Sequence, residues 1–161
     1  MRRKDREITD IDEIIKIVSD CDVLHLGMSD NNMPYVVPVN FGFSHKEGIL
    51  TFYIHCATTG KKIDILKSNP QVFLQLDCRH QVTLGSLQKP CAFSFAYASI
   101  MAKSHALFIE DTKEKSIALN HIIAHTAKSN TKYEFPLPML NKTCIIAFKA
   151  EDLSAKAHNI N

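Results

Sequence analysis

The segment Thr58-Thr59-Gly60-Lys61-Lys62 combines hydroxyl and ammonium groups at a point where a helix is predicted to begin. The first backbone N–H groups of a helix have no partner within it, and the helix dipole makes that end positive. Together these groups suit a phosphate. An ordinary helix start with solvated lysines fits the same residues, and the spacing of a Walker loop is absent.

Two strands predicted just before this segment, at 35–43 and 49–56, alternate apolar and polar residues. Paired as a hairpin, they would place small and polar side chains on one face: Pro38, Asn40 and Gly42 opposite Thr51, Tyr53 and His55. Small residues let a planar ligand approach the backbone, and polar groups supply donors at its rim. Because His55 precedes Lys61 by only six residues, this face and the phosphate segment would share one pocket. A structural sheet with this face in solvent is the competing interpretation.

Other candidate chemistry is weaker. His121 and His125 are four residues apart in a predicted helix, a spacing at which two imidazoles can share a metal. No HExxH pattern or third ligand accompanies them, so a metal site is disfavoured. Cys56 falls on the apolar face of its strand and is interpreted as a small buried residue of low reactivity. No nucleophile-elbow motif is present.

Apolar periodicity predicts the elements that must position these residues. Helices are expected at 11–20, at 61–68 and from Asp111 onward. Strands are expected at 23–28, 35–43, 49–56, 71–77, 92–102, 104–109 and 143–149, the fifth and sixth of which could form one bent strand. The stretches 78–90 and 133–140 are interpreted as loops, and 151–161 is weakly patterned. Because turns join most strands, a doubly wound parallel sheet is excluded, and a mainly β antiparallel barrel with flanking helices is predicted.

Length and composition indicate the domain count and disfavour several classes of protein. The 161 residues, 45% of them hydrophobic and 22% charged, predict a single globular domain over 1–161. A net charge of +2 gives no support for nucleic-acid or membrane-surface binding. No apolar segment resembles a secretory signal or a membrane span, so a cytoplasmic location is expected. The five cysteines form no CxxC pair and are interpreted as reduced thiols.

Several segments, taken together and in order, resemble a known family. They are the opening 1–10, Cys21-Asp22-Val23, Leu26-Gly27, the stretch from Pro34 to Gly42, the stretch from His55 to Asp64, Asn69-Pro70, and the segment from Tyr97 to Asp111. The sequence is similar to the nitroimidazole-resistance-type flavoproteins, which belong to the pyridoxamine-phosphate-oxidase-like FMN-binding split barrels. The resemblance extends over nearly the whole chain.

This resemblance implies a six-stranded antiparallel split barrel that forms a homodimer, with one FMN at each end of the interface. Pro38, Val39 and Asn40 would line the isoalloxazine ring, and Tyr53 and His55 would lie near the flavin and the substrate. The phosphate would be held by Thr58, Lys61 and Lys62, and the second chain would offer Ser99. The implied function is an FMN-dependent reductase or oxidase of a small planar substrate, with His55 as a possible catalytic proton donor.

The segment 99–106 departs from the family pattern. Ala102 and Ser104 replace two glycines, and His105 takes a position that is usually basic. The added side chains are expected to narrow the site or change its specificity. Two alternatives therefore stay open. The first is a non-catalytic split barrel that stores FMN or binds haem, with His55 or His105 as the axial ligand. The second is a cofactor-free dimer that senses a ligand.

Overall fold

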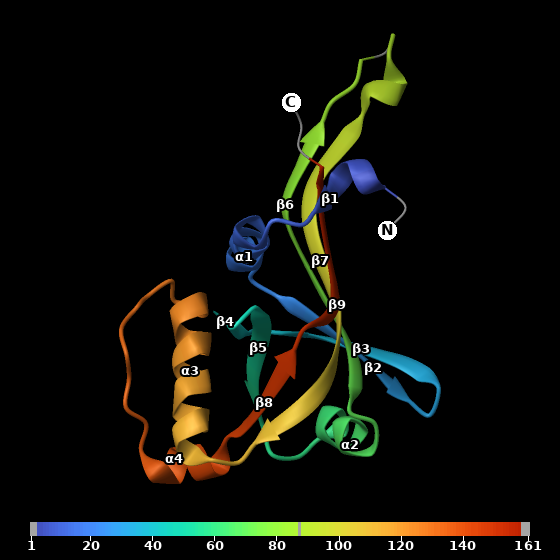
Figure 1. Cartoon of the computed structure of the whole chain (residues 1–161). Coiled ribbons are helices and arrows are strands. Elements are labelled where there is room, and N and C mark those ends of the chain that lie inside the picture. The colour runs from blue at the N-terminus through green and yellow to red at the C-terminus, as the bar shows by residue number, and fades with distance from the viewer. Residues whose placement is uncertain (1–2, 87, 159–161) are drawn as a thin grey trace.

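The computed structural model describes residues 3–86 and 88–158, and one strongly curved antiparallel sheet dominates them (Figure 1). The order along the sheet is β3-β2-β6-β7-β8-β5-β4, and the end strands β3 and β4 do not pair with each other. A ninth strand, β9, pairs with β7 and β1. The strands are β1 (Glu7–Ile8), β2 (Leu24–Asp30), β3 (Met33–Val39), β4 (Gly42–Lys46), β5 (Ile49–Cys56), β6 (Gln71–Thr83), β7 (Ser94–Ile109), β8 (Cys144–Lys149) and β9 (Glu151–His158). The predicted mainly β fold with flanking helices is confirmed.

The three predicted helices are present with the expected starts. They are α1 (Ile11–Asp20), α2 (Lys61–Ser68) and α3 (Thr112–Thr126). The Asp10 carboxylate accepts a hydrogen bond from the backbone N–H of Glu13 (2.8 Å), and Asp111 caps α3 in the same way. Such caps satisfy backbone donors that a helix cannot pair internally. No described helix is both long and apolar enough to cross a membrane.

The main core fills the inside of the curved sheet. Alternate positions of β2, β6 and β7 point inward, so that Leu26, Leu74 and Ile100 are fully buried. Burial of such aliphatic side chains contributes about 1.5–3 kcal/mol each to folding. Helix α1 closes one end of the core through Ile17 and Val18. The sheet is therefore held in its curved form by a continuous apolar interior.

The predicted strand at 35–43 divides in two. Met33–Val39 pairs with β2, whereas Gly42–Lys46 pairs with β5. The hairpin expected between 35–43 and 49–56 is consequently wrong for Pro38 and Asn40, which are outside the β4–β5 ladder. The chain leaves one half of the sheet and enters the other at this point.

Three stretches are more ordered than the sequence predicts. Strand β6 continues through 78–83, where the register shifts between Cys78 and Gln81 and Arg79 has φ 58°. This bulge breaks the alternation that identifies a strand. The resulting β6–β7 hairpin projects beyond the body of the molecule (Figure 1). The weakly patterned end forms β9, and the expected loop 133–140 contains the start of α4 (Leu137–Lys142). The short 3-10 helices η1 (Lys4–Arg6) and η2 (Pro90–Ala92) complete the elements.

Helix α3 packs against β4 and β5 at a position where the sheet has no side chain. A Cβ placed on Gly42 would lie 2.3 Å from the backbone nitrogen of Ile122 and 2.4 Å from the carbonyl carbon of His121. The close approach therefore requires glycine, and it sets the position of the helix relative to the 38–40 segment.

Candidate functional site

A hollow of about 610 Å³, here called the α3 hollow, brings together four of the predicted site residues. It is lined by Pro38, Val39, Asn40, His55, Ile122, Ile123 and Thr126. Pro38, Asn40 and His55 are exposed, and Val39 is half-buried. The α3 hollow thus combines apolar walls with an amide, an imidazole and a hydroxyl, which is typical of sites for small organic ligands.

The architecture explains why these residues meet although their predicted pairing is wrong. The 38–40 segment carries the chain from the end of β3 toward β4, and His55 lies near the end of β5. Helix α3 supplies the facing wall through Ile122, Ile123 and Thr126. The site therefore depends on the close packing of α3 against Gly42, which no short sequence pattern reveals.

Tyr53 is not part of this lining. Its ring stacks on His121 with centroids 5.4 Å apart and planes 7° apart, and its hydroxyl oxygen is 3.1 Å from Ser44 Oγ. Burial, with a smaller effect of Lys46, lowers the pKa of His121. Tyr53 thus joins α3 to the sheet and does not line the α3 hollow.

The two histidines considered as metal ligands have separate roles. His125 Nε2 is 2.8 Å from the carbonyl oxygen of Cys21, and its ring packs on Phe41 with centroids 4.3 Å apart. Burial is the main cause that lowers the pKa of His125. Across residues 3–86 and 88–158, no group of three or more metal-ligating side chains occurs.

The predicted phosphate residues are dispersed. Lys61 Nζ is 3.2 Å from Asp30 Oδ2 and 4.9 Å from the ring centroid of Tyr35, so it contacts the β2–β3 hairpin. Lys62 is half-buried in the first turn of α2. Thr58 lines a different cavity of about 190 Å³, here called the α2–α4 cavity. Only the local position of these residues at the start of α2 matches the expectation.

Sequence reasoning missed Lys115, which also lines the α2–α4 cavity. Only 7% of this lysine is exposed, and its ammonium donates to the carbonyl oxygens of Leu140 (3.2 Å) and Thr143 (3.0 Å). Carbonyl groups at the end of a helix favour a cation. Lys115 therefore holds α4 against α3. The one sequence signal is helical spacing, because Lys115 lies three residues before Ala118 and four before Leu119, on the buried face of α3.

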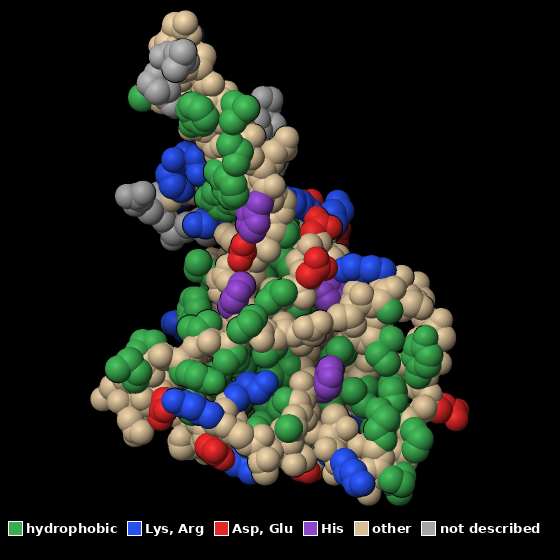
Figure 2. All heavy atoms as spheres, turned by 180° about the vertical axis from the view of Figure 1, so that it is seen from behind, with side chains coloured by type: hydrophobic (Ala, Val, Ile, Leu, Met, Phe, Trp, Pro, Cys, Tyr) green, Lys and Arg blue, Asp and Glu red, His purple; other side chains and the backbone are tan. Residues whose placement is uncertain are grey.

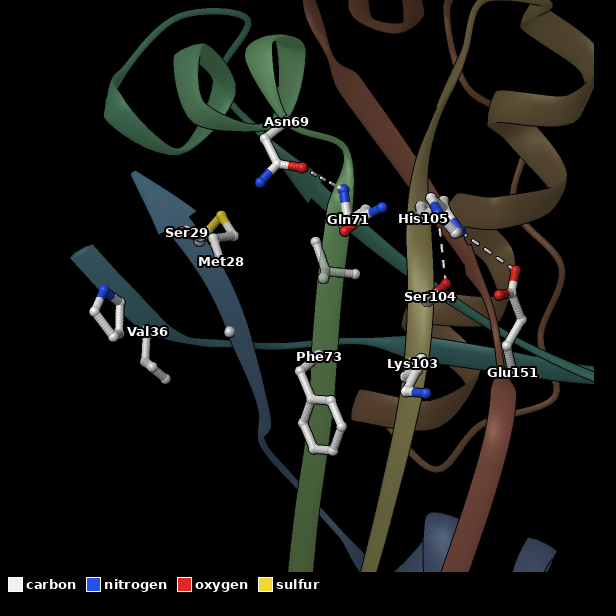
Figure 3. A pocket seen from close by; sticks show the side chains of 13 residues that line it. Met28, Ser29, Val36, Asn69, Gln71, Phe73, Lys103, Ser104, His105 and Glu151 are labelled. Carbon is white, nitrogen blue, oxygen red and sulfur yellow. Dashed lines mark hydrogen bonds and ion pairs between the residues drawn. The ribbon is translucent and has the colours of Figure 1, made fainter. Parts of the chain in front are cut away.

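The residues that replace the family glycines do not reach the α3 hollow. Ala102 and Ser104 are buried on β7, and Ser104 Oγ donates to the carbonyl oxygen of Lys149 (2.7 Å). His105 lies in a second hollow of about 670 Å³, where its Nδ1 is 3.4 Å from Glu151 Oε1 (Figure 3). Figure 3 also shows Phe73 and Lys103 on the neighbouring strands of that hollow. Neither Ala102 nor Ser104 lines the α3 hollow of its own chain, and Ser104 lines the second hollow together with His105.

Ser99 lies on β7 between Asp77 of β6 and Lys156 of β9. It is 7% exposed, and its buried hydroxyl has no hydrogen-bond partner among the described residues. A buried hydroxyl without a partner costs folding free energy. The structure thus separates Ser99 from the α3 hollow of its own chain.

The family model described as pyridoxamine 5'-phosphate oxidase matches residues 10–157. A candidate 5-nitroimidazole antibiotic resistance protein from Bacteroides thetaiotaomicron superposes with a TM-score of 0.80 at 27% identity, covering 94% of this chain and 86% of the other. No curated protein matches the chain significantly.

Two further solved structures share the fold at lower identity. The flavocytochrome Anf3 from Azotobacter vinelandii has a TM-score of 0.77 at 18% identity, covering 99% of this chain and 72% of the other. An FAD- and haem-binding protein from Mycobacterium smegmatis has a TM-score of 0.74 at 16% identity, covering 96% and 74%. At these identities the similarity demonstrates the split-barrel fold alone.

Proposed function

Because the chain belongs to the pyridoxamine 5'-phosphate oxidase family, we propose that it is an FMN-binding flavoprotein that acts as an oxidoreductase on a small planar substrate. The observation that carries this proposal is the α3 hollow. Pro38, Val39, Asn40 and His55, chosen from the sequence as flavin contacts, line this one hollow. Its apolar walls fit a planar ring system, and its few polar groups can orient one.

Each lining residue has a distinct task in this proposal. Pro38 and Val39 offer a surface with few protruding atoms against one face of the ring. Asn40 and His55 supply polar groups near its edge, and His55 is exposed enough to pass a proton to a bound substrate. A bound flavin supplies the electron transfer itself, whereas the protein provides position and electrostatics.

The phosphate is assigned to the start of α2, where Lys62, Thr58 and free backbone N–H groups are available. Lys61 already contacts Asp30, so binding through Lys61 would require it to leave that carboxylate. We therefore expect Lys62→Ala to weaken FMN binding more than Lys61→Ala.

The proposal includes a homodimer formed through the outer face of the sheet. Exposed apolar side chains extend along this face from the body into the projecting β6–β7 hairpin, as the hydrophobic surface in Figure 2 illustrates. They are Val36, Phe73, Val82, Phe95 and Met101. Val82 lies directly opposite Phe95 in the ladder, so both point to the same side. Apolar surface of this extent on a soluble chain is typical of an interaction face.

The dimer is tested by sedimentation. Phe73→Lys combined with Phe95→Lys should convert the protein to monomers, because charges would be placed at the centre of the contact. Ile117→Lys is the matched control, since Ile117 is equally exposed but lies on α3. A wild-type protein that sediments as a monomer would contradict this part of the proposal.

The flavin is tested by the visible absorption spectrum of the purified protein, before and after addition of FMN. We expect flavin bands at one FMN per chain, and weaker binding in Asn40→Ala and His55→Ala than in Lys113→Ala, a surface control. A chain that takes up no flavin overturns the proposal. A chain that binds flavin without being reduced by any nicotinamide or chemical donor overturns the redox role only.

The alternative is a non-catalytic protein that binds haem. His55 is exposed in the α3 hollow and His105 in the second hollow, so each imidazole could serve as an axial ligand. A Soret band in place of flavin bands would favour this alternative. Its loss in His55→Ala or His105→Ala would identify the ligand.

A further inference from the structure

The five free cysteines occupy three different environments. Cys91 is exposed, near the tip of the projecting hairpin. Cys21 and Cys78 are buried, and Cys56 and Cys144 are half-buried. Thiol reactivity depends on exposure and on the thiolate fraction, so the three groups should differ in their response to an oxidant.

Cys56 and Cys144 are aligned for a covalent bond. They are direct partners in the antiparallel ladder, at the end of β5 and the start of β8. Side chains of direct partners point to the same face, and their Cα atoms are typically about 4.5 or about 5.5 Å apart. Both values lie within the range of about 4.4–6.8 Å that a disulfide requires. The ladder pairing therefore gives the two cysteines the spacing and the common face that a disulfide requires.

A small oxidant has a path to this pair. Cys144 lines the α2–α4 cavity together with Thr58, Lys67 and Lys115. Burial, and the neighbouring Cys56 thiol, raise the pKa of Cys144 to about 11, and the nearby Lys115 cation opposes that change. A peroxide that enters the cavity therefore reaches Cys144 directly, with Cys56 beside it in the ladder.

Cys21 and Cys78 form a second pair of neighbouring thiols, but both are buried and an oxidant cannot reach them as it can reach Cys144. Cys21 is fully buried after α1, and Cys78 Sγ donates to the carbonyl oxygen of Ile17 (3.6 Å). Burial raises the pKa of both thiols, and each thiol affects the pKa of the other. The two sulfurs are neighbours, but the α1 contacts cover them.

We propose that Cys56 and Cys144 are a redox modification site, at which a hydroperoxide converts the two thiols into a reversible cross-strand disulfide. One thiol loses its proton, and the thiolate attacks the peroxide, so that the O–O bond breaks and a sulfenic acid forms. The leaving hydroxide (or alkoxide) takes up that proton and becomes water (or an alcohol). The opposite thiol displaces the hydroxyl group as a second water, and the S–S bond forms. Two electrons pass from the sulfurs to the peroxide, and an external thiol reverses the reaction.

The disulfide has a local structural effect. Cys56 follows His55 directly and precedes the 57–60 segment that leads into α2. A bond to Cys144 would fix this end of β5 against β8 and restrain that segment. The inference does not rest on flavin binding, because it uses only the position and access of the thiols.

The experiment treats the full-length, reduced protein with hydrogen peroxide and then alkylates remaining thiols in the native state and after unfolding. Peptide mapping should identify a Cys56–Cys144 link, alkylation of Cys91 in the native state, and alkylation of Cys21 and Cys78 only after unfolding. The rate should increase with pH, because the thiolate is the nucleophile. Backbone N–H groups at 57–60 should exchange several-fold more slowly in the oxidised protein.

Cys56→Ser and Cys144→Ser should each abolish the link, and Cys78→Ser, the matched control from the buried pair, should retain it. A Cys21–Cys78 link formed first, or sulfinic acids without a link, would overturn the proposal. Unchanged exchange at 57–60 in the linked protein would overturn the restraint. If a variant does not fold, the map of the wild-type chain still decides.

Discussion

Replacement of Gly42 by alanine tests whether the close packing of α3 against β4 determines the geometry of the candidate site. The added Cβ would lie 2.3 Å from the backbone nitrogen of Ile122. Ordinary contacts are about 3.5–4.0 Å, so the helix or the strand must move by more than about 1 Å. Because the clash is with backbone atoms, no change of rotamer can relieve it.

The expected loss of stability is at the upper end of the range for overpacking, about 3 kcal/mol. For a chain of this length, 1 kcal/mol corresponds to about 2–4 °C in Tm. Gly42→Ala should therefore lower Tm by about 6–12 °C. The displaced α3 wall should also enlarge the α3 hollow, so ligand binding there should weaken even at temperatures where the variant is folded.

The assay is thermal unfolding followed by circular dichroism, with hydrogen exchange of α3 in the folded state. Gly48→Ala is the matched control, because an added Cβ there meets nothing within 4 Å and its φ of 77° costs only backbone strain. That control should lose about 1–2 kcal/mol and leave exchange in α3 unchanged. A Gly42→Ala protein as stable as the wild type, with normal exchange in α3, would refute the reasoning.

Three further predictions concern single side chains. Lys115→Met should destabilise the protein by about 2–3 kcal/mol in urea unfolding, because two carbonyl groups lose a charged donor. Lys113→Met is the control, because Lys113 is exposed on the same helix, and it should change stability by less than about 0.5 kcal/mol. Asp111→Ala should cost about 1 kcal/mol in the same assay by removing the α3 cap, and an unchanged midpoint would contradict that role. Burial lowers the pKa of His121 and His125 in the folded state, so the unfolded chain binds protons more tightly. Stability should hold above the ordinary histidine pKa of about 6.5 and fall as pH decreases below it; a Tm equal at pH 7.5 and about 5.5 would contradict this.

Much of the fold follows from local patterns in the sequence. Alternation predicts the buried face of β5, and helical spacing with a capping aspartate predicts α1 and α3, because these signals depend on neighbours within a few residues. The Asn69-Pro70 pair ends α2 as expected, since a residue before proline avoids helical geometry. The segment 58–62 lies at the start of α2, as predicted, because a helix start depends on nearby residues.

Other features depend on contacts between distant residues. The bulge at Arg79 conceals the continuation of β6, and Pro136 and Pro138 suggest a loop, although proline is tolerated in the first turn of α4. Lys115 resembles a solvated lysine until α4 covers it. In each case the local signal is weak and a partner far along the chain supplies the stabilising contact.

The sequence by itself determined which residues have the chemical groups that a site would need, because residue type and local spacing define donors, small surfaces and helix starts. Only the tertiary structure decided which of them meet. The fold places Asn40 and His55 around one hollow beside α3, and it brings Lys61 next to Asp30. It also places Cys144 opposite Cys56 in the β5–β8 ladder. These pairings arise from the curvature of the sheet and from the position of α3 on it. Both depend on packing of the whole core rather than on any short segment.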